Sequence, residues 1–352
     1  MVRCRSCVAA TLKRLFKLLL STVYQTLNNY NNMILAPISF APYLKDVIWG
    51  GSKICKYKQL PASSDKVGES WEISAVPGHE SVVDAGEYKG MTLPELIDRF
   101  GVQLLGSKVV ERYGKAFPLL IKIIDANQNL SVQVHPDDEL ARKRHNSLGK
   151  TEMWYVIQSD KDANIYAGLN TAMTPDDYVR RVAEGSFAET LAVHDSHPGD
   201  VFFLPAGRVH AIGAGNLLAE IQESSDVTYR IYDYDRRDAQ GNTRELHTEL
   251  AKDAIDFTLY DELKSPRPAD SNPDAEIVKC DHFDVRRLLV NGESEFKFNP
   301  DSFTVLIGIE GEAVLSYPAG EMVLKAGHTV LLPAELSQIK VSGNACLLSG
   351  QC

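Results

Sequence analysis

The chain has 352 residues, with 37 Lys and Arg against 47 Asp and Glu, a formal net charge of −10 at pH 7, and 44% hydrophobic residues. This is the composition of an ordinary globular protein with ample material for a core, and the length predicts two domains or one large domain with an added lobe. The acidic balance, without a long basic stripe, excludes nucleic acid as the main partner, because phosphate contacts need clustered Lys and Arg.

The N-terminal segment 1–32 differs in composition from the rest of the chain. It contains five Lys and Arg and no Asp or Glu, and its apolar run is too short to span a bilayer, which takes about 20 residues. Cys4 and Cys7 form a C-x-x-C pair without the second pair that a zinc site needs. We therefore expect residues 1–32 to be a dispensable extension and expect no membrane contact. The six cysteines are scattered, which indicates the reducing cytoplasm.

From Met33 the chain reads as mainly β with inserted helices. Strands are expected at 34–40, at 48–54 with a Gly50–Gly51 turn, at 119–124, 130–135 and 153–157, and again from residue 199. Helices are expected at 93–113, as one helix or a pair, from a Thr174 N-cap to about Leu191, and at 245–259. A segment rich in Pro, Ser and Asp at 264–275 predicts a linker, and short β-type runs fill residues 276–352.

One predicted strand carries polar side chains on a single face. Because side chains alternate between the two faces of a strand, Ser131, Gln133 and His135 point one way and Val132 and Val134 point the other. The polar face is therefore a candidate wall of a functional cavity.

An internal repeat links the two parts of the chain. The segments 199–210 and 327–338 contain glycine, apolar residues and Pro-Ala in the same register. The first copy ends in His210 and the second in Gln338. This repetition predicts two related β-barrels, of which only the first can use the histidine.

The segment that ends in His210 resembles the second half of the cupin, or double-stranded β-helix, motif: Gly, five residues, then Pro-x-Gly-x-x-His. Gln133, His135 and Glu152 occupy the place of the first half. An amide oxygen, two imidazoles and a carboxylate suit zinc, and iron, manganese or cobalt are also compatible.

The fold class predicted from these patterns is mainly β, with two cupin barrels, inserted α-helices and a degenerate second barrel. The expected divisions are an extension at 1–32, a catalytic cupin domain at 33–263, a linker at 264–275 and a C-terminal cupin-like domain without metal ligands at 276–352.

Several motifs together resemble one enzyme family. Residues 133–136, 149–155 and 205–211, with further matches at 48–51, 68–74 and 220–235, are similar to the type I mannose-6-phosphate isomerases in their short bacterial form. The resemblance covers about residues 34–350. It implies a cytoplasmic aldose–ketose isomerase, monomer or homodimer, that carries one Zn²⁺ per chain and acts on a phosphorylated hexose, mannose 6-phosphate or fructose 6-phosphate.

By position, the resemblance implies roles for individual residues. The implied metal ligands are Gln133, His135, Glu152 and His210. The implied active-site residues are Arg230, Asp226 and Lys150, with Lys122 and Ser131 lining the same pocket.

The residues also suit the reaction on chemical grounds. Moving a proton between C1 and C2 through a cis-enediol requires a base near both carbons and a positive centre for the developing oxyanion. Glu220 and Asp226 are candidate bases, and Glu220 is equally a candidate supporting residue. The candidate phosphate contacts are Ser131, Lys122, Lys150 and Arg230, and the sequence does not choose among them. Asp233, Asp235, Arg236 and Arg237 are expected to form a solvated charge cluster.

Other functions fit parts of this pattern. A non-catalytic sugar-phosphate sensor is expected to have lost a metal ligand or Arg230, and all of these residues are present. A cupin oxygenase favours two or three histidines with iron and an apolar cavity, whereas one Gln, one Glu and nearby cations suit a phosphorylated polyol better. An isomerase for another phosphorylated hexose is a further alternative.

Overall fold

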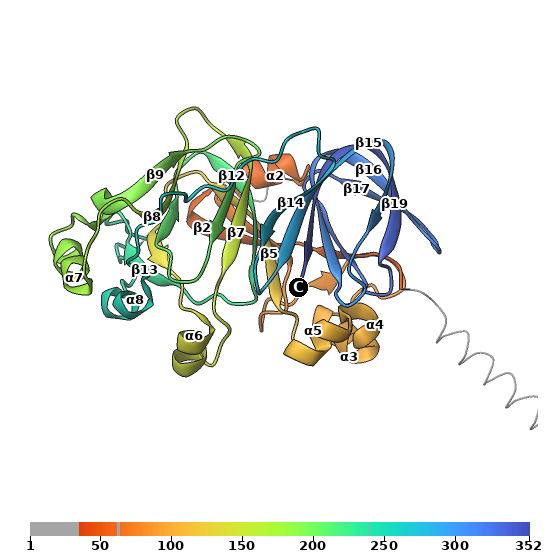
Figure 1. Ribbon diagram of the computed structural model, residues 1–352, viewed down its shortest axis with the longest axis horizontal. Helices are drawn as coiled ribbons and strands as arrows, with labels where there is room; N and C mark the ends of the chain where they lie inside the picture. Colours follow the sequence, from red (N-terminus) through yellow and green to blue (C-terminus); the bar gives the residue numbers. More distant parts are fainter. Residues whose placement is uncertain (1–34, 62–63, 239) are drawn as a thin grey trace, which may run out of the picture. The chain divides into compact units, whose positions relative to one another are not determined.

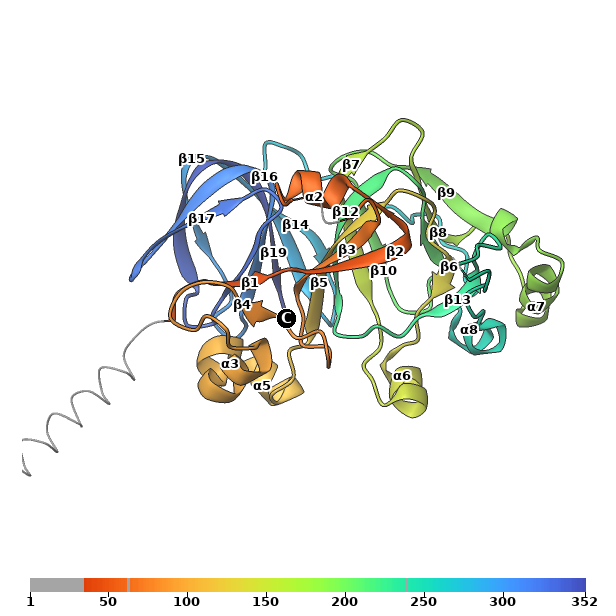
Figure 2. The same cartoon turned by 180° about the vertical axis from the view of Figure 1, so that it is seen from behind.

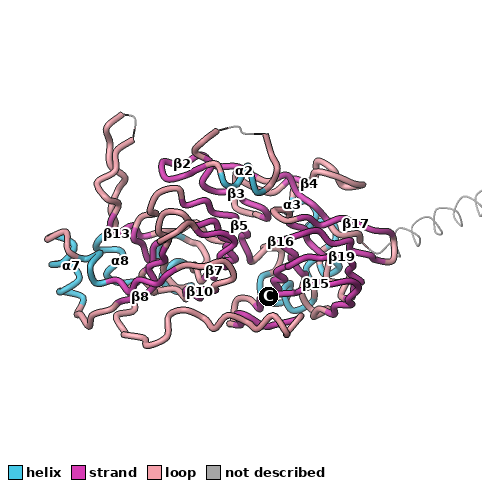
Figure 3. The backbone as a smooth tube through the Cα atoms, turned by 90° about the horizontal axis from the view of Figure 1, so that it is seen from above, coloured by secondary structure: helices cyan, strands magenta, loops and turns pink. Residues whose placement is uncertain are grey.

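The computed structural model describes residues 35–61, 64–238 and 240–352 (Figure 1). The predicted extension at 1–32, with Cys4 and Cys7, lies outside the described residues. Strands make up much of the described chain, and α7 and α8 lie beside β8 and β13 (Figure 3). Within these ranges, no helix is both long enough and apolar enough to cross a membrane.

The elements follow one another in short segments. The strands are β1 (Ile38–Ala41), β2 (Tyr43–Gly51), β3 (Val67–Ile73), β4 (Val82–Val83), β5 (Leu119–Ala126), β6 (Val132–Val134), β7 (Glu152–Ser159), β8 (Asn164–Leu169), β9 (Leu191–Asp195), β10 (Val201–Leu204), β11 (His210–Ile212), β12 (Asn216–Glu223), β13 (Tyr229–Tyr232), β14 (Asp274–Lys279), β15 (Asp284–Lys297), β16 (Thr304–Tyr317), β17 (Gly320–Lys325), β18 (Thr329–Leu332) and β19 (Gln338–Gln351). The helices are α2 (Lys53–Tyr57), α3 (Leu93–Phe100), α4 (Val102–Leu105), α5 (Ser107–Tyr113), α6 (Asp138–His145), α7 (Pro175–Ala183) and α8 (Thr248–Ala254), with a short 3₁₀ turn, η1 (Phe187–Thr190). Within the predicted linker at 264–275, residues 264–273 contain neither helix nor strand, whereas residues 274 and 275 already belong to β14.

The strands form three sheets. A six-stranded sheet has the order β10-β7-β12-β5-β3-β2, and a five-stranded sheet has the order β13-β6-β11-β8-β9. The third sheet has the order β14-β15-β19-β16-β18-β1-β4, with β17 paired to β16. Figure 2 shows β1 and β4, from the start of the described chain, beside the blue strands of the C-terminal half. The two ends of the described chain therefore share one sheet.

The six- and five-stranded sheets bury a common core. Trp154 and Phe202 from the first sheet pack in one cluster with Ile165 and Ile212 from the second. The opposite face of the five-stranded sheet carries Val132 and Val134, which pack in a cluster with Tyr178 of α7 and Ala251 of α8. The predicted alternation along β6 is thus confirmed, because its two valines face the helices while Gln133 faces the other way.

The internal repeat has matching local structure. Gly199 and Gly327 both adopt positive φ, 88° and 80°, at the turn that leads into β10 and β18 respectively. His210 is the first residue of β11, and Gln338 is the first residue of β19. The equivalent positions therefore begin strands in both copies, although only one of them is a histidine.

Three predicted helices have different bounds in the structure. The helix expected at 93–113 is divided into α3, α4 and α5 by Gly101 and Gly106, which both have positive φ. The helix from Thr174 ends at Ala183, where the chain turns through Gly185 at φ 72°, and 187–190 is a 3₁₀ turn. The helix expected at 245–259 extends only over Thr248–Ala254.

The strand expected at 48–54 is also wrong in part. Strand β2 ends at Gly51, and Lys53 begins a helix whose first N–H donates to Asp125 Oδ2 at 2.7 Å. Gly50 and Gly51 belong to the strand and do not form a turn. A Cβ on Gly50 would lie 2.1 Å from Lys66 O, so a close backbone approach explains this glycine.

Candidate metal centre and active site

The candidate site lies at one end of the core between the six- and five-stranded sheets, where the inward-facing side chains along the strands change from apolar to polar. In β5, Lys122 precedes the core residue Ile124, and in β7, Glu152 precedes the core residue Trp154. Side chains two apart share a strand face, so both charged groups point to the inside of the sheet pair. Glu220 in β12 is directly opposite Lys122 in the ladder. The sequence thus places charged groups at one end of an otherwise apolar core.

Two histidines and a carboxylate converge at this end. Atoms of His135, Glu152 and His210 that could bind a metal all lie within 4.8 Å of one another, and the three residues are buried. Glu152 Oε1 is 3.2 Å from His210 Nε2, and Glu152 Oε2 is 3.6 Å from His135 Nε2. Gln133 pairs directly with His210 between β6 and β11. Three of the four predicted metal ligands therefore form one cluster, and the fourth adjoins it.

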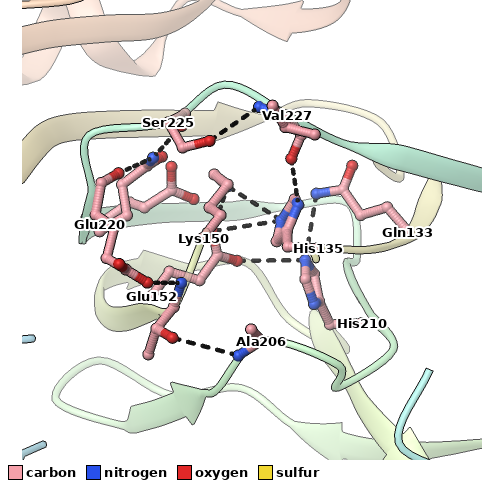
Figure 4. A network of polar contacts seen from close by, with 12 residues as sticks. Gln133, His135, Lys150, Glu152, Ala206, His210, Glu220, Ser225 and Val227 are labelled. Atoms are coloured by element: carbon pink, nitrogen blue, oxygen red, sulfur yellow. Dashed lines mark hydrogen bonds and ion pairs between the residues drawn. The ribbon is translucent and has the colours of Figure 1, made fainter. Parts of the chain in front are cut away.

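Backbone carbonyls fix the orientation of both imidazole rings. His135 Nδ1 is 3.0 Å from Val227 O (Figure 4), and His210 Nδ1 is 2.8 Å from Arg208 O. A carbonyl oxygen only accepts, so each Nδ1 carries the hydrogen and each Nε2 keeps a lone pair. Both lone pairs face Glu152. This arrangement, in which the second ring nitrogen is held by a hydrogen bond, is typical of histidine metal ligands.

Lys150 and Gln133 complete the inner ring of contacts. The Lys150 ammonium is 3.1 Å from His135 Nε2 and donates to Glu152 Oε2, so it lies between these side chains in Figure 4. Gln133 Nε2 is 3.3 Å from His210 Nε2, and its amide nitrogen therefore faces the ring rather than its oxygen. A half-turn of the amide exchanges the two atoms and would direct the oxygen to the same point.

A second buried network supports the other side of the cluster. Lys122 Nζ donates to Glu220 Oε1 at 2.9 Å and to Gln222 Oε1 at 2.7 Å. Trp154 Nε1 donates to the other oxygen of Glu220, also at 2.9 Å. Both oxygens of Glu220 are thus occupied by fixed donors, which makes this carboxylate part of a rigid frame.

Burial and neighbouring charges shift several pKa values here. Burial, helped by the Lys150 ammonium, lowers the pKa of both His135 and His210, so both rings are neutral at neutral pH. Burial also raises the pKa of Glu152, which Lys150 opposes. For Glu220 burial acts in the same direction, but the Lys122 and Lys150 ammonium groups, together with the hydrogen bonds from Lys122 and Trp154, outweigh it and lower the pKa. Glu220 is therefore held ionised.

A cavity of about 390 Å³ opens above this cluster. The predicted site residues on its wall are Lys122, Ser131, Gln133, Lys150, Glu220, Asp226 and Arg230. His135, Glu152 and His210 are not on the wall, but Gln133 and Lys150 touch both the cavity and the cluster. The structure therefore brings all ten predicted site residues to one place.

Arg230 and Asp226 differ from the other charged groups on this wall. Arg230 is half-buried and donates from Nη1 to Glu245 O at 2.9 Å, while its buried Nε has no hydrogen-bond partner within the described ranges. Asp226 is exposed, and in the described part of the chain its carboxylate makes no hydrogen bond or ion pair. Both groups keep binding capacity toward the cavity.

Sequence reasoning gave no site role to several residues of the cavity wall, among them Lys45, Glu69, Trp71 and Arg244. Lys45, Glu69 and Trp71 come from the paired strands β2 and β3, and Arg244 comes from the segment after β13. Two ammonium groups lie near the Trp71 ring, with Lys45 Nζ 5.3 Å and Lys122 Nζ 5.2 Å from its centre. The family-like motifs at 48–51 and 68–74 are the available signal for a contribution from β2 and β3.

The charge cluster expected to be solvated is partly buried. Asp233 is only 5% exposed and accepts from Arg244 Nε at 2.8 Å and from Arg236. Asp235 and Arg237 are exposed, as expected. The prediction fails at Asp233 because its main partner is distant in sequence and returns through a hairpin turn.

The cluster has the chemistry of a metal centre. Two Nε2 lone pairs and a carboxylate are a donor set that zinc favours, and Glu152 Oε1 is buried without a hydrogen-bond donor among the described residues. A buried acceptor without a donor is costly, and a cation bound there satisfies it. These residues therefore fit a divalent metal ion.

Comparison with known proteins agrees with the geometry. A family model described as phosphomannose isomerase type I, catalytic domain, matches residues 38–174, and one described as mannose-6-phosphate isomerase, cupin domain, matches 274–349. Mannose-6-phosphate isomerase ManA of Bacillus subtilis (strain 168) is 39% identical over 90% of this chain and 99% of its own. Mannose-6-phosphate isomerase of Streptococcus mutans is 33% identical over 88% of this chain and 96% of its own.

The fold agrees as well. The crystal structure of the mannose 6-phosphate isomerase from Bacillus subtilis matches this structure with a TM-score of 0.81 at 34% identity. The match covers 90% of this chain and 99% of that chain.

Proposed function

The chain belongs to the type I phosphomannose isomerases, and from this membership we propose that it interconverts mannose 6-phosphate and fructose 6-phosphate as a zinc-dependent aldose–ketose isomerase. The observation that carries the proposal is the pair of Nε2 lone pairs that face one carboxylate beneath a cavity lined by cations. In the proposed reaction a proton moves between C1 and C2 through a cis-enediol.

Four residues hold the metal in this proposal: His135, His210, Glu152 and Gln133. When bound, zinc supplies a Lewis acid beside the oxygens on C1 and C2 of the sugar. The chain's own contribution is to keep both imidazoles neutral, through burial and the two backbone carbonyls on Nδ1. Lys150, already against the cluster, adds a positive charge that stabilises the developing oxyanion.

The contacts favour Asp226 over Glu220 as the base. Both oxygens of Glu220 are engaged, and its lowered pKa makes it a weak proton acceptor. Asp226 lines the same cavity, and its carboxylate forms no hydrogen bond or ion pair with any residue that the structure describes. We therefore assign proton transfer to Asp226 and assign to Glu220 the task of holding Lys122 in place.

The phosphate fits best at the Arg230 end of the cavity. Lys45, Lys122 and Lys150 each form an ion pair with a carboxylate, whereas Arg230 contacts a neutral carbonyl. Arg244, which is itself held in an ion pair by Asp233, adds a second guanidinium on the same wall. Guanidinium groups favour phosphate because they donate two parallel hydrogen bonds, and the buried hydroxyl of Ser131 is a further donor.

We also propose that residues 276–352 form a second cupin domain without metal ligands, in which Gln338 replaces the histidine of the first. The matched glycine turns and strand starts of the repeat support this assignment. One zinc ion per chain follows from it. The free cysteines at 55, 280, 346 and 352 suit a reducing cytoplasm.

A coupled assay tests the function directly. Purified protein is assayed for conversion of mannose 6-phosphate to fructose 6-phosphate before chelation, after chelation and after return of zinc, with metal per chain measured by mass spectrometry. We expect activity to be lost and then regained with about one zinc per chain. His135→Ala and His210→Ala are expected to lose both activity and bound zinc, because each leaves two strong ligands.

The exposed His328 provides the matched control. His328→Ala is expected to keep normal activity and zinc content. Normal turnover in either His135→Ala or His210→Ala would remove the metal assignment. No turnover by fully zinc-loaded wild-type protein would instead favour a sugar-phosphate sensor or another phosphorylated hexose.

A further inference from the structure

The backbone before Glu152 is held by acceptors that lie outside the cavity. Gly149 N donates to Asp138 Oδ1 at 2.8 Å, Lys150 N to Pro136 O at 3.1 Å, and Thr151 N to Glu223 Oε2 at 2.7 Å. Three successive N–H groups are therefore fixed from behind. The segment 149–152 contains Lys150 and Glu152, and both of their side chains contact His135.

Glu223 connects this segment to the C-terminal half. It is 3% exposed, and its other oxygen, Oε1, lies 3.0 Å from Nδ1 of His282 in an ion pair. His282 belongs to the loop between β14 and β15, and its side chain is 22% exposed. The Thr151 hydroxyl also accepts from Ala206 N at 3.4 Å, in the turn before His210. One chain of contacts therefore runs from the C-terminal half to both sides of the metal cluster.

We propose that His282 is a positioning residue for the reaction: by pairing with Glu223 it fixes Thr151 and so sets Lys150 and Glu152 against His135. The proposal rests on the proposed function, since it assigns a role to a group that does not touch the cavity. It also assigns a catalytic purpose to the contact between the two halves.

Charge explains why Glu223 needs this partner. A carboxylate that is almost fully buried is stable when a cation and hydrogen-bond donors face it together. Glu223 and, more weakly, Asp138 raise the pKa of His282, whereas burial and Arg112 of α5 oppose them. Without the imidazolium, Glu223 either takes up a proton or turns toward another donor, and in both cases its bond to Thr151 N weakens.

The test combines kinetics with hydrogen exchange on the full-length, zinc-loaded protein. In His282→Ala we expect kcat to fall about tenfold, KM to stay within about twofold and zinc content to stay unchanged, as for other supports of metal ligands. Amides of residues 149–152 should exchange about tenfold faster, while amides of β5 do not change. His282→Gln, which restores a donor to Glu223, should recover part of both losses.

His197 offers a matched control, because it also pairs with a carboxylate, Asp200, at 3.6 Å and is far more exposed. His197→Ala should change neither readout. Unchanged exchange at 149–152 in His282→Ala would overturn the proposal, as would faster exchange spread evenly over the chain. Loss of a second equivalent of zinc would also overturn it, because Asp138, Glu223 and His282 would then be ligands. The exchange result does not depend on activity, so an inactive wild type would refute the proposed function alone.

Discussion

Replacing Lys122 with Met tests the buried frame under the active site. Methionine keeps much of the length of lysine but removes the charge that faces Glu220 at 2.9 Å. The two side chains are only 8% and 6% exposed, although both reach the wall of the cavity, so water can replace the ammonium only in part. Glu220 keeps its bond from Trp154 but becomes a buried carboxylate without its main counter-charge.

The expected cost is large. Removing one partner of a buried ion pair typically destabilises a protein by about 3–5 kcal/mol, because the remaining charge is left uncompensated. Adding Glu220→Gln removes that charge, and the amide oxygen can still accept from Trp154. The double variant should therefore recover at least about 2 kcal/mol of the loss.

Urea unfolding followed by tryptophan fluorescence and circular dichroism gives the free energies of unfolding. In the wild type the pKa of Glu220 is lowered on folding, so its contribution is complete above the ordinary glutamate pKa and is lost as pH falls. In Lys122→Met burial outweighs the remaining charge of Lys150 and raises this pKa, so stability falls as pH rises. The difference in free energy of unfolding between the wild type and Lys122→Met should thus be larger at pH 7 than at pH 4.

Lys115 supplies the control, because it pairs with Asp98 at 2.7 Å on the surface, where the two side chains are 74% and 66% exposed. Lys115→Met should change the free energy of unfolding by less than about 1 kcal/mol. If Lys122→Met costs no more than this control, or if its difference from the wild type does not depend on pH, the reasoning about a buried counter-charge is refuted.

Two further substitutions test other parts of the structure. Gly311→Ala should cost at least about 1 kcal/mol more in urea unfolding than Gly292→Ala: both have positive φ, but a Cβ at 311 would lie 2.0 Å from Asn344 O and one at 292 meets no atom within 4 Å. Asp233→Asn should raise KM for mannose 6-phosphate about fivefold with kcat within about twofold, because Asp233 orients Arg244 toward the cavity. An unchanged KM there would exclude Arg244 as a phosphate contact.

Strand patterns were predictable where local alternation decides the outcome. The face shared by Gln133 and His135 follows from side-chain periodicity alone, and the structure confirms it. Helix ends were less predictable, because they depend on distant partners. Gly106 interrupts the helical run by its φ of 89°, at a point where a Cβ would lie 2.3 Å from the backbone of Asp301. The first N–H of the helix at Lys53 is capped by Asp125. Neither contact can be predicted from the neighbouring residues in the sequence, because both partners are distant along the chain.

The candidate site divides in the same way. The cluster of His135, Glu152 and His210 could be found because each residue lies in a short motif with its own spacing. Trp71 and Arg244 could not, because they reach the cavity only through strand pairing and a returning hairpin. Asp233 shows why the prediction of burial failed. A carboxylate among arginines in the sequence is expected to be exposed to solvent, and only the fold shows that Asp233 is buried.

The pairing of β1 with β18 has a consequence for synthesis on the ribosome. Ile38 lies opposite Leu331, so the first strand waits for a partner that is made near the end of the chain. At about 5–20 residues per second this delay is roughly 15–60 s. Throughout that time β1 has an open edge, which a neighbouring nascent chain can occupy. Slower elongation late in the message is therefore expected to increase strand-exchanged or aggregated product, whereas a strand added in trans should reduce it.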